Sequence, residues 1–149
     1  GIALMGSIAS SPSLRLDLLD AAEQRRAEVP EIAAALAAWQ HALPAEGVER
    51  LMELSLEGGD ADRGAALVNF HSASACLRCH ALDGHGGNAA PALDGVGARL
   101  SRRGLLESLI DPNAAIAEGY TAPSAMPEMS TLLTPRELRD IVEYLHSLR

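Results

Sequence analysis

The chain has 149 residues, of which 48% are hydrophobic but only 3% aromatic, so its core must consist largely of leucine, alanine, valine and isoleucine. This length allows one domain with a real core, or a small domain with an appendage. The net charge is −8 and every basic residue is arginine, which argues against nucleic acid as a partner, and no apolar run is long enough for a membrane span.

Residues 1–58 are predicted to form three short amphipathic helices separated by proline and glycine. Ser13 is expected to cap the first helix, Pro30 to begin the second and Pro44 to end it, and the third closes at Gly58-Gly59. We interpret this part as an N-terminal helical extension. Two arrangements stay open, the last units of a helical repeat or extra cover packed on the following domain. The apolar positions on the three helices are Leu14, Leu18, Leu19, Ala22, Ile32, Leu36, Trp39, Val48, Leu51, Met52 and Leu54.

Residues 59–149 are predicted to contain three further helices joined by two loops rich in glycine and proline, and no strand. Asp60 is expected to cap a helix that runs to Phe70, and Ser101 a helix that Asp111-Pro112 stops. The last helix has the strongest signal, because Thr134, Pro135 and Glu137 form a capping-box sequence ahead of an apolar face. The fold class predicted for the chain is all-α.

Residues 76–80 read Cys-Leu-Arg-Cys-His and use both cysteines of the chain. Two thiols at this spacing can each add to a vinyl group of one haem, and the histidine then becomes the proximal ligand of the iron. The motif therefore predicts one haem c, bound through Cys76 and Cys79 with His80 on the iron. A zinc site would need a second pair of ligands and a redox dithiol a βαβ setting, and the sequence shows neither.

The pattern of helices and loops around this motif resembles a class I cytochrome c domain. More narrowly, residues 59–149 are similar to the haem-binding domain at the C-terminus of large exported dehydrogenase-like proteins of planctomycetes and verrucomicrobia. The stretches that carry this likeness are Gly59-Asp60-Ala61-Asp62-Arg63-Gly64, the haem motif, residues 93–99, residues 106–113 and Ser124-Ala125-Met126-Pro127. Residues 14–43 are similar to the helical region that precedes the domain in such proteins.

The resemblance implies that a backbone carbonyl at Ala90-Pro91 accepts a hydrogen bond from His80 and fixes its tautomer. On the opposite face of the iron, Met126 is the expected ligand because Pro127 holds it extended in a loop ahead of the last helix. Met129 is the alternative as a ligand or as packing, and a histidine ligand or an open site also remains.

Other residues are expected to surround the cofactor. Arg99 could pair with a haem propionate, or simply be solvated. The remaining histidines, His41, His71, His85 and His146, are expected to be surface or loop residues rather than ligands. The candidates for the apolar wall of the pocket are Leu93, Val96, Leu100, Leu109 and Leu145.

The function predicted from these residues is one-electron transfer by a haem with histidine and methionine ligands. By resemblance, the donor is a dehydrogenase domain and the acceptor a soluble cytochrome or an oxidase. The protein is expected to be periplasmic or otherwise exported, with its signal or upstream region removed. Two alternatives remain, a five-coordinate haem enzyme of the peroxidase kind and a helical interaction module in which the haem is structural.

Overall fold

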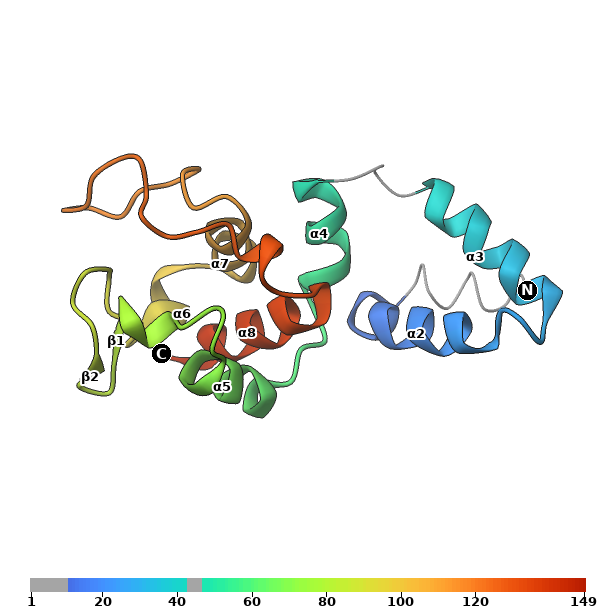
Figure 1. Cartoon of the computed structure of the whole chain (residues 1–149), viewed down its shortest axis with the longest axis horizontal. Helices are drawn as coiled ribbons and strands as arrows, with labels where there is room; N and C mark the ends of the chain where they lie inside the picture. Colours follow the sequence, from blue (N-terminus) through green and yellow to red (C-terminus); the bar gives the residue numbers. More distant parts are fainter. Residues whose placement is uncertain (1–10, 43–46) are drawn as a thin grey trace.

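The computed structural model describes residues 11–42 and 47–149, and it confirms an all-α fold (Figure 1). No helix in these described ranges combines the length and the apolar character needed to cross a membrane. In chain order the elements are η1 (Pro12–Leu14), α2 (Arg15–Arg25), α3 (Pro30–Ala42), α4 (Val48–Ser55), α5 (Ala61–Phe70), η2 (Cys76–Arg78), β1 (Ala81–Leu82), β2 (His85–Gly86), α6 (Val96–Arg99), α7 (Arg102–Ile110), η3 (Met129–Thr131) and α8 (Pro135–Ser147).

Three predicted helix starts are confirmed by side-chain caps. The carboxylate of Asp60 accepts a hydrogen bond from the backbone N–H of Arg63 at 2.9 Å, and the hydroxyl of Ser101 accepts one from Gly104. Thr134 forms the full capping box with Glu137 at the start of α8. These caps satisfy backbone N–H groups that the first turn of a helix leaves without partners, which is why local sequence located them correctly.

The first helix differs from its prediction. Ser13 lies inside the short η1 turn, and α2 begins at Arg15 with no side-chain cap. This shift turns Leu14 outward, to 54% exposure, and places Leu16 in the core instead. The second helix begins at Pro30 as predicted; Pro44, its expected end, lies outside the described residues.

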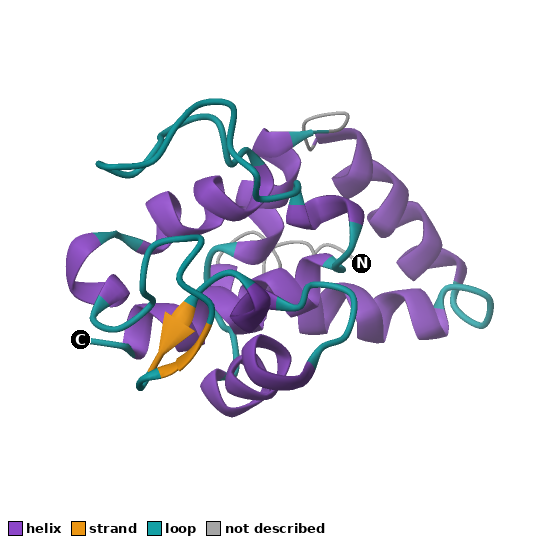
Figure 2. Ribbon diagram, turned by 60° about the vertical axis from the view of Figure 1, so that its left-hand side comes forward, coloured by secondary structure: helices purple, strands orange, loops and turns teal. Residues whose placement is uncertain are grey.

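The prediction that the second half contains no strand is wrong in one detail. Strands β1 and β2 form a two-residue antiparallel ladder, in which Ala81 pairs with Gly86 and Leu82 with His85 (Figure 2). Asp83 and Gly84 connect them, and both have positive φ, as a tight hairpin turn requires. Strands of two residues have no apolar alternation, so the only sequence signal for this hairpin is the Asp-Gly pair.

The main core of the described chain is centred on the crossing of α5 and α8, which make its most extensive helix contact. Gly64 allows this close approach, because a Cβ atom placed there would lie 2.0 Å from the carbonyl oxygen of Asp140. One turn later Val68 is buried against the same helix. Helix α7 covers α8 from another side and contributes its four buried residues, Leu105, Leu106, Leu109 and Ile110.

Helices α2 and α4 pack against the part of the chain that follows them. Helix α4 contacts both α7 and α8, and its Met52 belongs to the main core. A second cluster joins Leu16, Trp39 and Leu54, so that one apolar group from each of α2, α3 and α4 meets there. Figure 1 shows α3 on the outside of α2, away from α8.

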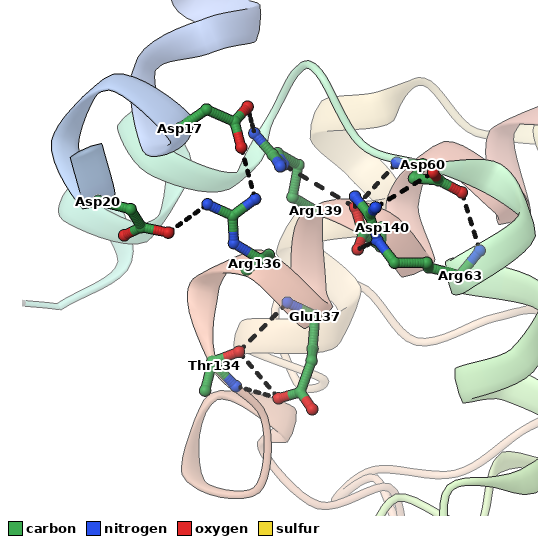
Figure 3. Close-up of polar contacts among 9 residues, drawn as sticks. All are labelled: Asp17, Asp20, Asp60, Arg63, Thr134, Arg136, Glu137, Arg139 and Asp140. Carbon is green, nitrogen blue, oxygen red and sulfur yellow. Dashed lines mark hydrogen bonds and ion pairs between the residues drawn. The ribbon is translucent and has the colours of Figure 1, made fainter.

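Ion pairs fix α2 on the first turns of α8 (Figure 3). Asp17 accepts hydrogen bonds from Arg136 at 2.6 Å and from Arg139 at 3.3 Å, and Asp20 contacts Arg136. The side chain of Arg139 is only 1% exposed, and its Nε–H has no hydrogen-bond partner. The carboxylate of Asp140 also lies 3.9 Å from this Nε, so Asp17 and Asp140 together neutralise a guanidinium that is almost inaccessible to water.

We expect Asp17→Asn to lower the free energy of unfolding by about 1–2 kcal/mol at pH 7, less than for a fully buried partner because Asp17 is half exposed. Hydrogen bonds from Arg136 hold the pKa of Asp17 below its ordinary value of 3.8. Because the folded pKa is lowered, the contribution is complete above about pH 4 and disappears as the pH falls through the folded pKa.

Guanidinium unfolding of both proteins across this range of pH checks the prediction. The control is Asp20→Asn, whose carboxylate contacts only the exposed part of the network and should change stability by about 0.5 kcal/mol or less. A difference between wild type and Asp17→Asn that stays constant down to pH 2 would show that the charge of Asp17 is not what stabilises the contact.

Candidate functional site

The Cys-Leu-Arg-Cys-His motif lies on the short η2 turn, directly after the loop that follows α5. Cys76 is partly buried against the main core, Cys79 is exposed, and both are free thiols. The turn is closed by backbone hydrogen bonds from Cys79 and His80 to the carbonyl oxygen of Cys76. Burial raises the pKa of the Cys76 thiol, which keeps it in the neutral form.

Residues 81–93 wrap around this turn and are attached to it through the backbone. The N–H of Gly87 donates to the carbonyl of Leu77, and the N–H of Ala90 donates to the carbonyl of Cys79. Gly87 has to be glycine here, since a Cβ atom would lie 2.3 Å from the carbonyl oxygen of Arg78. The loop and the motif therefore form one rigid unit, even though the loop has little regular structure.

His80 is oriented by this loop. Its Nδ1 lies 2.7 Å from the carbonyl oxygen of Pro91, in the segment where the resemblance placed the acceptor. A carbonyl oxygen can only accept, so Nδ1 must carry the hydrogen, and in the neutral ring Nε2 then holds the free lone pair. A histidine that binds a metal through Nε2 needs this tautomer, and the outer hydrogen bond also fixes the plane of the ring.

Met126 lies in the long loop between α7 and η3, and it is partly buried against the same core that Cys76 and Leu77 contact. Two side chains that sequence reasoning did not identify shape this loop. The amide oxygen of Asn113 accepts a hydrogen bond from the N–H of Ser124 at 2.8 Å, which ties the loop across its base. The hydroxyl of Ser124 then accepts one from the N–H of Met126. The only sequence signal for the contact between Asn113 and Ser124 is the position of Asn113 directly after Asp111-Pro112.

Met129, the alternative ligand, has a different setting. It begins the η3 turn and is 4% exposed within the main core. Its carbonyl accepts hydrogen bonds from Leu132 and Leu133, so its backbone is fixed by the turn. Met129 is therefore enclosed by the core, whereas Met126 lies at its edge.

Arg99, at the end of α6, has backbone partners. Its guanidinium donates to the carbonyl oxygens of Asp94 at 2.6 Å and Ala92 at 2.7 Å. It therefore braces the loop directly after Pro91. Among the apolar residues predicted to line the pocket, Leu100 is 40% exposed, while the others are buried in the main core: Leu93, Val96, Leu109 and Leu145.

The other histidines have partners away from the motif or are exposed. His71 bonds to Ser74 and lies 4.0 Å from a carboxylate oxygen of Glu137, and His85 bonds to the carbonyl of Asp83. His146 contacts Arg102, and desolvation together with that neighbouring charge lowers its pKa. His41 is exposed on α3. The described residues contain no group of three or more histidine, cysteine or acidic side chains that could hold a metal ion.

The donor set fits a haem. Two free thiols on one turn, an imidazole with its Nε2 lone pair available and a thioether at the edge of the same core are the groups that a c-type haem uses. The core around these groups is largely aliphatic, since only 3% of the residues are aromatic, and it provides the apolar surroundings that a porphyrin requires.

Comparison with known families agrees with this reading. The family model for cytochrome c matches residues 61–149, which is more than half of the chain. A comparison with curated proteins gives no match. The chain therefore belongs to the cytochrome c family, as a class I c-type cytochrome whose function is haem-based electron transfer.

Proposed function

We propose that this protein carries one electron at a time on a single haem c, attached through Cys76 and Cys79, with His80 and Met126 as the axial ligands. The observation that carries the proposal is the hydrogen bond from His80 to the carbonyl of Pro91, because it presents Nε2 as a ligand. A haem bound at this site supplies the one-electron chemistry of Fe(III) and Fe(II).

The chain's own residues have three tasks in this proposal. Pro91 and the loop braced by Arg99 keep the His80 ring in one orientation. Asn113 and Ser124 hold the Met126 loop through hydrogen bonds that reach the backbone of Met126 itself. Ligands that stay in place when the charge of the iron changes keep the reorganisation small, and this favours rapid electron transfer.

The guanidinium of Arg99 has five N–H donors, and two of its nitrogens bind carbonyl oxygens. The remaining donors are the ones we propose for a haem propionate. Leu93, buried at 9% exposure beside this arginine's loop, is the wall residue that we expect to contact the porphyrin. Both assignments rest on the loop after Pro91, because Leu93 belongs to it and Arg99 binds its carbonyls.

We further propose that residues 59–149 are the haem domain and residues 1–58 an extension that packs on it. Support comes from the ion pairs between α2 and α8 and from α4, which contributes Met52 to the main core and Leu54 to the second cluster. The sequence likeness to the C-terminal haem-binding domain of exported dehydrogenase-like proteins suggests a periplasmic protein. In that setting it relays electrons from a dehydrogenase to a soluble cytochrome or an oxidase.

A redox titration followed by visible spectroscopy tests the proposal. The expected result is a reversible one-electron transition of a low-spin haem, with the weak near-infrared sulfur-to-iron band in the oxidised form and no response to peroxide. A high-spin spectrum that changes on addition of cyanide or peroxide would contradict the proposal and favour the haem enzyme. Removal of the extension should leave the potential nearly unchanged but weaken partner binding if the extension is a docking element, and unaltered binding would contradict that role.

A further inference from the structure

Phe70, the last residue of α5, is 84% exposed, far more than any other large hydrophobic residue described. It follows Val68, which is buried against α8, by two positions. Two residues correspond to a rotation of roughly 200° around a helix, so Phe70 faces away from the core that Val68 enters. Burying an aromatic ring gives a large favourable free energy, and exposed aromatic residues are common anchors of protein interfaces.

A groove lies beside this ring, between α5 and the first turns of α8. Its volume is about 470 Å³, its surface is mainly apolar, and Ala66 and Leu67 contribute to it together with Phe70 itself. The groove is open to the surface, and it is large enough for an aromatic side chain. One patch of the molecule thus contains both a projecting ring and a groove able to receive one.

The charges around the groove balance one another. The lining includes the arginines Arg63 and Arg136 and the carboxylates Glu137 and Asp140. Arg63 bonds to Asp140 at 2.8 Å, and Arg136 bonds to Asp17 at 2.6 Å. Glu137 accepts from the backbone of Thr134. On a chain with net charge −8, this is a surface where two like molecules can meet without bringing unpaired carboxylates together.

We propose that this surface binds a second copy of the same chain, with the Phe70 ring of each copy seated in the α5/α8 groove of the other. A two-fold axis places one surface against itself, so a patch that carries both ring and groove is self-complementary. A strongly charged partner finds no unpaired opposite charge at this rim. The inference goes beyond electron transfer and does not depend on which residue binds the iron.

Analytical ultracentrifugation of the haem-loaded protein, from micromolar to near-millimolar concentration, tests this. Wild type should show a monomer–dimer equilibrium that strengthens with added salt, because screening reduces the repulsion between two chains of charge −8. Phe70→Ser should raise the dimer dissociation constant at least about tenfold, as loss of an interface anchor does.

The matched control is Leu14→Ser, which removes another exposed hydrophobic side chain, 54% exposed, outside the groove. It should leave the dimer dissociation constant within about twofold, as surface changes away from an interface do. Far-UV circular dichroism should show that both variants keep their helices. A wild type that sediments as a monomer throughout would overturn the proposal and leave the groove for a different partner. Dimerisation of Phe70→Ser with the wild-type constant would overturn it as well.

Discussion

Replacing Met126 with alanine should lower the midpoint potential by on the order of 0.1 V or more, part of the roughly 0.8 V range that axial ligands span. The physical reason is that a thioether sulfur stabilises reduced iron, and its loss leaves water or nothing in that position. The near-infrared sulfur band should disappear and added cyanide should bind much faster. A redox titration and stopped-flow mixing with cyanide measure the two effects.

Met129→Ala is the matched control, since it removes a methionine three residues away that is 4% exposed in the core. It should cost about 2–4 kcal/mol of stability through the cavity it leaves, with little effect on the sulfur band. If Met129→Ala abolishes the band and Met126→Ala keeps it, the ligand assignment is reversed. If neither variant changes the spectrum, the protein has no methionine ligand at this loop.

Gly64→Ala should be among the most destabilising single substitutions in the chain, with a loss of about 3 kcal/mol in unfolding free energy, at the upper end for overpacking. The new Cβ atom would lie 2.0 Å from the carbonyl oxygen of Asp140 and 2.7 Å from the Cβ atom of Tyr144. Neither atom can move unless α5 and α8 separate. The melting temperature and the guanidinium midpoint of the haem-loaded protein measure the effect.

Gly104→Ala makes the same change in α7, where the nearest atom to the new Cβ is the Ser101 hydroxyl at 3.6 Å. This is ordinary contact, so the better helix propensity of alanine should stabilise the protein by up to about 1 kcal/mol. The two substitutions are expected to change the free energy of unfolding in opposite directions. This difference separates the clash between packed helices from the helix propensity of alanine. Equal effects at both positions would show that the α5/α8 crossing tolerates a Cβ atom at Gly64.

Local signals predicted the helix starts because each depends on residues three or four positions apart. Asp60, Ser101 and Thr134 each cap a helix through such a pair. The first helix was placed less accurately. Ser13 is a residue type that often caps helices, but here it lies inside a 3-10 turn that begins at Pro12. Leu14 was then assigned to the apolar face although it is mostly exposed.

Contacts between distant parts of the chain could not be predicted from local sequence. Asp17 and Arg139 are 122 positions apart, and in the sequence each looks like an ordinary charged surface residue. The link between Asn113 and Ser124 is shorter but crosses a loop that has no periodicity. Both contacts arise only once the core has brought their elements together, so neither leaves a pattern in the sequence.

Among the site residues, the sequence predicted the types better than the partners. The motif predicts roles for Cys76, Cys79 and His80, and the family resemblance pointed to the Pro91 carbonyl that the His80 ring contacts. Arg99 binds two backbone carbonyls that the sequence did not predict, and its expected contact with a propionate stays a prediction. Phe70 was placed in a helix correctly, but its 84% exposure depends on which face of α5 meets α8.

Covalent attachment of a haem to Cys76 and Cys79 can be tested by intact-mass analysis under denaturing conditions. The protein should be produced with a cytochrome c maturation system, beside a Cys76→Ser, Cys79→Ser double variant. We expect the wild type to retain the mass of one haem after denaturation and the double variant to have the mass of the bare chain. A wild-type chain without added mass, produced by a maturation system that loads another c-type cytochrome, would contradict it.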